Sequence, residues 1–264
     1  MKKIIISFWM FFLSVGLAQE KKITPILLSN QQLVADEFIN MDSFGYCYYI
    51  KGNVFYKQKD AELFQYKNLS LGKIKRVDLQ NPLKIVLFYE GFNSVITLDN
   101  QLNETSSINF SKNKNNPIVT SAVGLASQNR LWVFNSLPMQ LGLYDFTKQV
   151  FQPLSQPFQD PIEYYQTDYN QFYWVDSNRT VSFCDVFGKI STLGKIPEFD
   201  SAQIISTDVV IYQSGNQLYC HSFKENKSSP INLDEKIVEK FRIKDQFLII
   251  FTNNEISTYQ ISLP

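Results

Sequence analysis

A pattern of two β-type runs recurs about every 40 residues along this sequence, at the spacing typical of repeat architectures. Each copy has an apolar run, a short polar turn and a second, alternating run that closes on an aromatic and a polar residue. The second runs are LFQYK (63–67), VITLD (95–99), LGLYD (141–145), VSFCD (181–185), QLYCH (217–221) and ISTYQ (256–260). Self-similarity of this kind, built from strand residues, is the signature of β-propeller blades.

The repeat predicts an all-β fold, a β-propeller of six four-stranded blades. The first runs, near-continuously apolar, are expected to be middle strands covered on both faces: 46–50, 84–89, 130–134, 171–175, 209–212 and 246–251. The outer-strand candidates are 72–79, 107–110, 151–154, 190–193 and 230–233. In the first copy, residues 57–61 read as a lengthened turn.

The ends of the chain predict how the ring closes. The last copy reaches Pro264 with no room for an outer strand, whereas residues 22–28 form an orphan strand before the first blade. If the orphan pairs with residues 256–263, it completes the last blade and removes an exposed sheet edge.

The first 18 residues have the pattern of an export signal. Lys2 and Lys3 precede an apolar stretch, and Gly16, Leu17 and Ala18 form a small-residue cleavage site. We therefore expect a signal peptide at 1–18 and a single propeller domain at 19–264, located in the periplasm or at the outer membrane. An uncleaved anchor is the alternative, but the apolar stretch is shorter than the ~20 residues that a bilayer span needs. The mature chain has no other candidate span.

Charge excludes one class of function. The chain has 25 basic and 25 acidic residues, and loss of Lys2 and Lys3 leaves 23 basic against 25 acidic. A nucleic-acid binder needs a basic excess to neutralise phosphates, so none is expected as a partner. Neither GxGxxG nor a P-loop occurs, and no cofactor is expected.

The cysteines and the single histidine predict neither a metal site nor a disulfide. Cys184 and Cys220 align in one column of neighbouring copies, where equivalent strands fan apart beyond the ~7 Å reach of a disulfide. With Cys47, they are interpreted as small buried hydrophobes. His221 aligns with Asp99, Asp145 and Asp185, which predicts a polar strand end and no catalytic role.

Two segments resemble a known repeat. RLWVFNSLPMQLGLYDF (130–146) and QFYWVDSNRTVSFCDV (171–186) are similar to the repeat unit of exported bacterial propellers of the NHL and PQQ-like kind. The WD40 dipeptides and a quinone-cofactor motif are absent. The resemblance implies a fold and a habit of binding proteins or ligands on one propeller face, but it transfers no activity. Trp132 and Trp174, at matching places in these copies, are expected in the core between blades.

Features that break the repeat are the candidate partner contacts. An apolar tip, Leu137, Pro138 and Met139, interrupts one turn, and a proline-rich segment at 152–161 carries Phe158 and leads to Tyr164 and Tyr165. Desolvated apolar and aromatic groups contribute most to binding at interfaces. The favoured function is a non-enzymatic periplasmic scaffold that binds an envelope protein or an outer-membrane assembly or secretion complex. For the proline-rich segment, a rigid crossing whose aromatics pack between blades is the alternative.

An enzyme is the second hypothesis. Several propellers are glycosidases whose two acids flank the scissile bond. The acidic candidates for a carbohydrate-active or other small-molecule site at the channel are Asp160, Glu163, Asp168, Glu198 and Asp208. No one pair among them stands out, so no catalytic residue is assigned.

Overall fold

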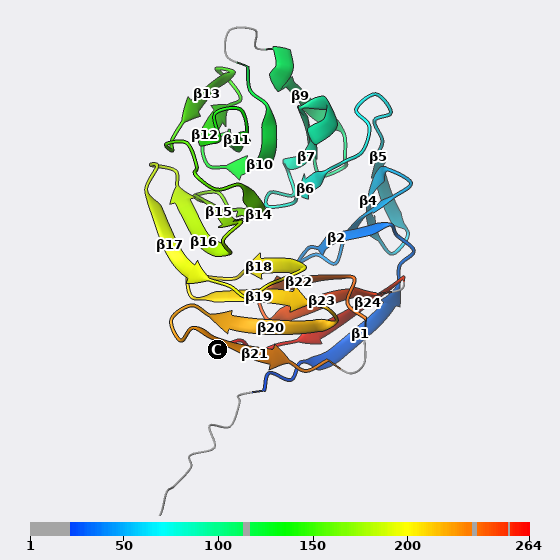
Figure 1. The fold of residues 1–264 in the computed structure, drawn as a ribbon. Helices are drawn as coiled ribbons and strands as arrows, with labels where there is room; N and C mark the ends of the chain where they lie inside the picture. The colour runs from blue at the N-terminus through cyan, green and yellow to red at the C-terminus, as the bar shows by residue number, and fades with distance from the viewer. Residues whose placement is uncertain (1–21, 113–116, 234–236, 253) are drawn as a thin grey trace, which may run out of the picture.

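The computed structural model describes residues 22–112, 117–233, 237–252 and 254–264. Over these ranges the chain forms six four-stranded antiparallel sheets arranged as blades around a central axis (Figure 1). Two one-turn 3-10 helices, η1 (Glu90–Phe92) and η2 (Phe110–Lys112), interrupt the strands. The prediction of an all-β, six-bladed propeller is confirmed. The expected signal peptide at 1–18 lies outside the described residues.

Each of the first five blades takes four consecutive strands, ordered from the axis outward. Blade 1 consists of β2 (Glu37–Met41), β3 (Cys47–Lys51), β4 (Val54–Lys59) and β5 (Glu62–Tyr66). Blade 2 consists of β6 (Arg76–Asp78), β7 (Ile85–Tyr89), β8 (Ser94–Leu98) and β9 (Glu104–Asn109). Blade 3 consists of β10 (Thr120–Ala126), β11 (Arg130–Asn135), β12 (Gln140–Asp145) and β13 (Val150–Pro153).

The remaining blades follow the same order. Blade 4 consists of β14 (Ile162–Thr167), β15 (Gln171–Asp176), β16 (Thr180–Asp185) and β17 (Ile190–Lys195). Blade 5 consists of β18 (Ser201–Ile204), β19 (Val209–Ser214), β20 (Gln217–Ser222) and β21 (Lys227–Ile231). Blade 6 consists of β22 (Lys240–Lys244), β23 (Phe247–Thr252), β24 (Glu255–Gln260) and, from the other end of the chain, β1 (Ile26–Gln32).

The N-terminal strand closes the ring as expected, with shifted bounds. β1 pairs antiparallel with β24, from Ile26 opposite Gln260 to Gln32 opposite Glu255. The predicted strand at 22–28 therefore begins four residues too early. Ile23 instead bridges to Ile231 of blade 5, and the Asn232 N–H donates to the Ile23 carbonyl at 2.8 Å. The N-terminal segment thus ties blades 5 and 6 together.

The first repeat differs from its prediction. Gly52 and Asn53, with φ of 58° and 59°, make a two-residue hairpin between β3 and β4. Both central residues of such a turn need positive φ, which glycine and asparagine tolerate. Residues 57–59 therefore end the third strand rather than lengthen a turn, and LFQYK (63–67) overlaps the outer strand β5. Residues 72–79, expected as an outer strand, hold the inner strand β6. The other four outer-strand candidates overlap β9, β13, β17 and β21.

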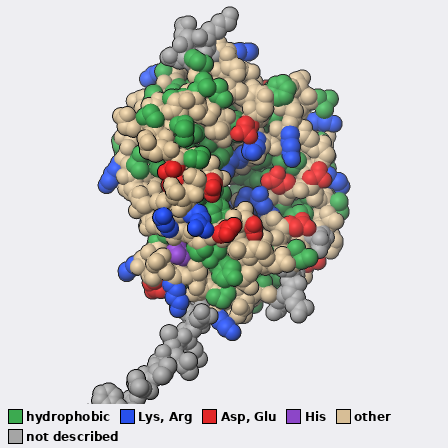
Figure 2. All heavy atoms as spheres, in the orientation of Figure 1, with side chains coloured by type: hydrophobic (Ala, Val, Ile, Leu, Met, Phe, Trp, Pro, Cys, Tyr) green, Lys and Arg blue, Asp and Glu red, His purple; other side chains and the backbone are tan. Residues whose placement is uncertain are grey.

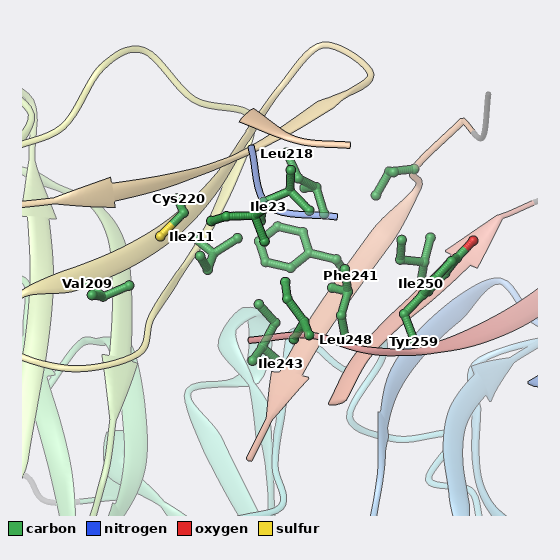
Figure 3. Packing of buried hydrophobic residues seen from close by; sticks show 13 residues of the cluster. Ile23, Val209, Ile211, Leu218, Cys220, Phe241, Ile243, Leu248, Ile250 and Tyr259 are labelled. Carbon is green, nitrogen blue, oxygen red and sulfur yellow. The ribbon is translucent and has the colours of Figure 1, made fainter. Parts of the chain in front are cut away.

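The core is divided among the contacts between blades. Among the described residues, one cluster of buried apolar side chains lies at each of the six boundaries between neighbouring blades. Figure 3 shows the cluster of blades 5 and 6, where Ile211 and Cys220 face Phe241 and Leu248. Burial on both faces explains why the middle strands are nearly continuous apolar runs.

Strand pairing shows that the sequence alignment of blade 5 is wrong by one residue at Cys220 and His221. In blade 4 Phe172 pairs with Cys184, and in blade 5 the equivalent Val210 pairs with His221. His221 therefore occupies the buried column of Cys184, and the predicted polar strand end is wrong. A shift by one residue moves a side chain to the opposite face of a strand.

The three cysteines are free and buried, each in a different cluster between blades. Burial raises the pKa of Cys47 and of Cys184 to about 12, and that of Cys220 to about 11. Because the thiolate is the reactive form, these side chains act as small hydrophobes.

Both tryptophans are buried, as predicted, but not at equivalent places. Trp132 pairs with Leu143, two residues before the end of β12, whereas Trp174 pairs with Ser182, three residues before the end of β16. They project from opposite faces of their blades and so enter the same cluster, between blades 3 and 4. Trp132 is fully buried, and its indole N–H donates to the Asp168 carbonyl at 2.9 Å.

Removal of β1 is expected to destabilise the whole domain. A chain lacking residues 19–32 leaves the edge of β24 unpaired and uncovers the last blade, so the melting temperature should fall by roughly 2–4 °C for each kcal/mol lost. A chain lacking only residues 19–22 keeps both β1 and the Ile23 bridge to blade 5 and is the matched control. Calorimetry of both checks this, and equal melting temperatures would contradict closure by β1.

Trp132→Ala is expected to lower the free energy of unfolding by about 3–5 kcal/mol, the usual result for a large buried aromatic. The exposed Leu137→Ala should change it by less than about 0.5 kcal/mol. Denaturant titration measures both values. A loss below about 1 kcal/mol for Trp132→Ala would show that its cavity collapses or that the indole is not buried.

His221 makes stability depend on pH. Burial lowers its pKa, and the nearby Asp208 carboxylate opposes this shift. The unfolded chain therefore takes up a proton below about pH 6.5 that the folded protein resists, so stability is complete above that pH and declines as the pH falls toward the lower folded pKa.

Substitution of His221 by Gln is expected to remove this contribution. Ser228, which lies 3.0 Å from His221 Nδ1, can hydrogen-bond to the amide in its place. Melting temperatures of the wild type and H221Q should differ by a constant amount above about pH 7, and the wild type should lose more below about pH 6.5. A difference that stays constant from pH 8 to pH 5 would contradict this.

Candidate functional site

Antiparallel pairing places two kinds of loop on one face of the ring. The turns between second and third strands lie at the same end of each blade as the crossings from an outer strand to the next inner strand. We call this end the crossover face. The apolar tip at 136–139 joins β11 to β12, and the proline-rich segment at 154–161 crosses from β13 to β14, so both lie on the crossover face.

The tip and the crossing touch each other. The Phe158 N–H donates to the Met139 carbonyl at 2.8 Å. The Phe158 ring packs on Phe134 and Trp174, with ring centroids 5.1 and 4.6 Å apart. Phe158 and Met139 are half-buried, whereas Leu137 is 62% exposed and Pro138 is exposed. Phe158 therefore anchors the crossing between blades, and Leu137 and Pro138 face solvent.

Tyr164 and Tyr165 lie elsewhere, on the inner strand β14. The Tyr165 ring stacks on Phe172 with centroids 5.5 Å apart, and the Val123 N–H donates to its hydroxyl at 3.2 Å. Burial raises the pKa of both tyrosines. The six predicted contact residues thus fall into two groups, four at the crossover face and two beside the channel.

Further exposed apolar residues continue the tip across the crossover face. Val119 is 44% exposed, Phe92 50% and Leu69 80%. Hydrogen bonds join their loops side by side: the Ser136 N–H donates to the Val119 carbonyl, and Asn93 Nδ2 donates to the Ile118 carbonyl. The Phe92 ring lies where a side chain on Gly72, in the crossing that carries Leu69, would project. We call Leu69, Phe92, Val119 and Leu137 the apolar band.

Three of these four residues, Leu69, Phe92 and Val119, are not among the contact residues that the sequence predicts. Leu69 and Phe92 are single apolar residues in loops, and Val119 follows Ile118 directly before a strand. Exposed apolar residues of this kind are common on surfaces, whereas Leu137 belongs to an apolar tip within a polar turn. The four residues form a band only because the ring places their loops side by side.

A groove of about 460 Å³ lies beside the proline-rich crossing. Phe158 and Trp174 form its apolar part, and Asp160, Asp176 and Ser182 contribute polar groups. Asp160 is the one acidic candidate in this groove. The Asp176 carboxylate accepts hydrogen bonds from the backbone of the following turn and is held there.

The central channel is a second cavity, of about 540 Å³, lined by the inner strands. Its charged lining residues are Arg76, Asp78, Asp200, Lys240, Arg242 and Lys244. Figure 2 shows Lys and Arg side chains together with Asp and Glu around a hollow in the middle of one face. None of the five acidic candidates lines this channel.

The other acidic candidates lie in turns or on the exposed surface. Asp168 accepts the Asn170 and Gln171 N–H groups, and Asp208 accepts the Lys224 N–H, so both organise turns. Glu163 and Glu198 are exposed. The five carboxylates are therefore not gathered at the channel.

Side chains bridge the inner strands where the diverging backbones do not pair. Gln166 binds both the N–H and the carbonyl of Ile204, at 2.9 and 2.8 Å, and Gln203 binds both groups of Ile243. Arg242 Nε donates to the Ile39 carbonyl at 2.9 Å. Each side chain makes the hydrogen bonds that a neighbouring strand would make, and so links the inner strands that form the channel wall.

Two searches of the described residues bear on metals and membranes. No three His, Cys, Asp or Glu side chains gather as a group that could hold a metal ion. No helix in those ranges is long and apolar enough to cross a bilayer.

Comparison with known proteins identifies the fold. No family model matches the sequence, and no curated protein sequence does. Among solved structures, virginiamycin B lyase from Staphylococcus aureus aligns with a TM-score of 0.57 at 12% identity, over 84% of this chain and 79% of the other. A DUF4221 family member from Bacteroides vulgatus aligns with a TM-score of 0.59 at 7% identity, over 92% of this chain and 99% of the other.

A third similar structure is PorZ, described as an essential bacterial surface component of the type-IX secretion system of Porphyromonas gingivalis. It aligns with a TM-score of 0.50 at 12% identity, over 86% of this chain and 32% of PorZ. At such identities the likeness shows the fold alone. The chain is a β-propeller of the repeat type, as the repeat pattern of its sequence indicated.

Proposed function

We propose that this propeller is a non-enzymatic protein-interaction module of the bacterial envelope, a scaffold that binds a protein partner through its crossover face. The apolar band is the observation that carries the proposal. Its four side chains are at least 44% exposed and lie on hydrogen-bonded or contacting loops in the region from blade 1 to blade 3. Contiguous exposed apolar surface favours a site of protein association.

The architecture suits this role. Phe158 packs on Phe134 and Trp174 and hydrogen-bonds to Met139 of the tip, so Leu137 stands on a supported loop rather than a free one. A preorganised loop loses little conformational entropy when a partner binds. Polar loop residues such as Asn93 and Ser136 surround the band and would form the rim of an interface.

Two further features support an envelope location. The first 18 residues have the charge and apolar pattern of an export signal, which favours the periplasm or the outer membrane. One propeller of similar fold, PorZ, is a surface component of a secretion system. An outer-membrane assembly or secretion complex is therefore the partner class that we favour.

The proposal predicts a face-specific loss of binding. Phe92→Ser with Leu137→Ser removes two exposed apolar side chains from the band, while both loops keep their backbone hydrogen bonds. Leu83→Ser with Phe187→Ser removes two side chains, 71% and 90% exposed, from turns at the opposite end of the blades and is the matched control. After cross-linking in cells and purification, the envelope protein bound by the wild type should be lost from the first variant and kept by the control.

Equal loss or equal retention by the two variants would contradict the proposal, provided that both melt like the wild type. Turnover of a glycan panel by the wild type, without an envelope partner, would instead favour an enzyme. The fold shared with virginiamycin B lyase makes that test worthwhile, although none of the five acidic candidates lines the channel.

A further inference from the structure

The central channel carries an excess of positive charge. Four basic side chains line it, against two carboxylates, Asp78 and Asp200. Arg76 and Arg242 are half-buried and lie on the inner strands of blades 2 and 6, the two blades that flank blade 1. Within the described residues, neither guanidinium has a carboxylate within salt-bridge distance.

The two channel carboxylates are already engaged by backbone groups. Asp78 accepts the Gln80 N–H at 2.8 Å and the Leu125 N–H at 2.7 Å. Asp200 accepts the Gly215 N–H at 2.7 Å. These bonds hold the carboxylates at the channel wall, and within the described residues neither forms a salt bridge with Arg76 or Arg242.

The arginines are held by neutral groups. Arg76 reaches across to blade 4, where it donates to the Tyr165 carbonyl at 3.0 Å and lies 4.0 Å from the centre of the Tyr165 ring. Arg242 donates to the carbonyls of Ile39 and Phe241, at 2.9 and 3.3 Å. A guanidinium has five N–H donors, so most of the donors of Arg76 are left for a ligand.

Other polar and charged side chains lie near the two arginines. Burial lowers the pKa of Lys240, and the charge of Arg242 lowers it further, while the Glu37 carboxylate 3.3 Å away partly opposes both effects. Arg76 and Arg242 both act electrostatically on Tyr164, whose hydroxyl donates to Gln166 at 3.1 Å. The two guanidinia, one ammonium and a phenol therefore line the same channel, from blades 2, 6 and 4.

We propose that the channel binds a small organic anion, with its carboxylate or phosphate group held by Arg76 and Arg242. The fork of a guanidinium fits either oxyanion, and a partly buried site strengthens the attraction. The volume of about 540 Å³ falls within the range of small-molecule sites. The ligand neutralises the mutual repulsion of the channel cations, so it also stabilises the ring.

The proposal is tested by titrating citrate and inorganic phosphate, in separate arms, into the wild-type protein at low ionic strength. Calorimetry should show saturable binding of one ligand per chain for at least one anion, with a rise in melting temperature. Arg76→Gln with Arg242→Gln should weaken binding at least tenfold. Lys148→Gln with Lys224→Gln removes two exposed charges outside the channel and should leave binding unchanged.

A second measurement uses the wild type alone, because Arg76 and Arg242 also bridge the inner strands. Modification by p-hydroxyphenylglyoxal, followed by peptide mass spectrometry, should be slower at Arg76 and Arg242 in the presence of the bound anion, and unchanged at the more remote Arg179. Absence of saturable binding in both arms, equal binding by the channel and control variants, or no protection of the two arginines would overturn the proposal.

Discussion

The antiparallel pair of β1 with β24 is the contact on which the propeller depends. Every blade buries apolar side chains on both faces, so each needs a neighbour on either side and the row of sheets must return to its start. At the junction of blades 6 and 1, Phe38 stacks on Phe251 with ring centroids 6.1 Å apart. Strand β1 keeps blade 6 at four strands and so supplies this junction with a complete partner.

Closure of the ring also brings together the loops of the crossover face and the inner strands that line the channel. A closed ring brings the crossings of successive blades together at one end, and the loops that carry Phe92, Val119 and Leu137 become neighbours there. It brings the inner strands around one axis, where their backbones diverge and side chains such as Gln166 and Gln203 replace the ladder. Surface and channel are therefore both products of the same ring.

Much of the fold could be predicted from the sequence because the middle strands are buried on both faces and stand out as apolar runs. The inner strands could not be identified in this way: β6 is three residues long and mixes arginine, valine and aspartate, so it was assigned to an outer position. The alignment of His221 with aspartates failed for another reason. Blade 5 has an equally good match one residue away, and only strand pairing distinguishes a buried column from an exposed one.

For the candidate sites too, a residue could be predicted only where the local sequence gives a signal. Leu137 could be predicted because an apolar tip in a polar turn is a local signal. Arg76 and Arg242 give no local signal, since each is an ordinary basic residue on a short strand and only the ring brings them to one cavity. Tyr164 and Tyr165 follow a proline-rich crossing in sequence, yet both lie on β14, where Tyr164 packs against the cluster of blades 4 and 5 and Tyr165 against that of blades 3 and 4.

The pairing of β1 with β24 in blade 6 affects how the protein folds. Ile26 pairs with Gln260, so β1 can pair only after β24, at the other end of the domain, has been made. Pairing of strands so far apart in sequence has a large loop-closure entropy cost. Until then the edges of β1 and β24 are unpaired, whereas Ile26, Leu27 and Leu28 stay exposed even in the closed ring. Two unfinished copies that exchanged β1 would satisfy the same backbone hydrogen bonds as one finished copy. Such an exchange would make the yield of monomer depend on protein concentration during folding.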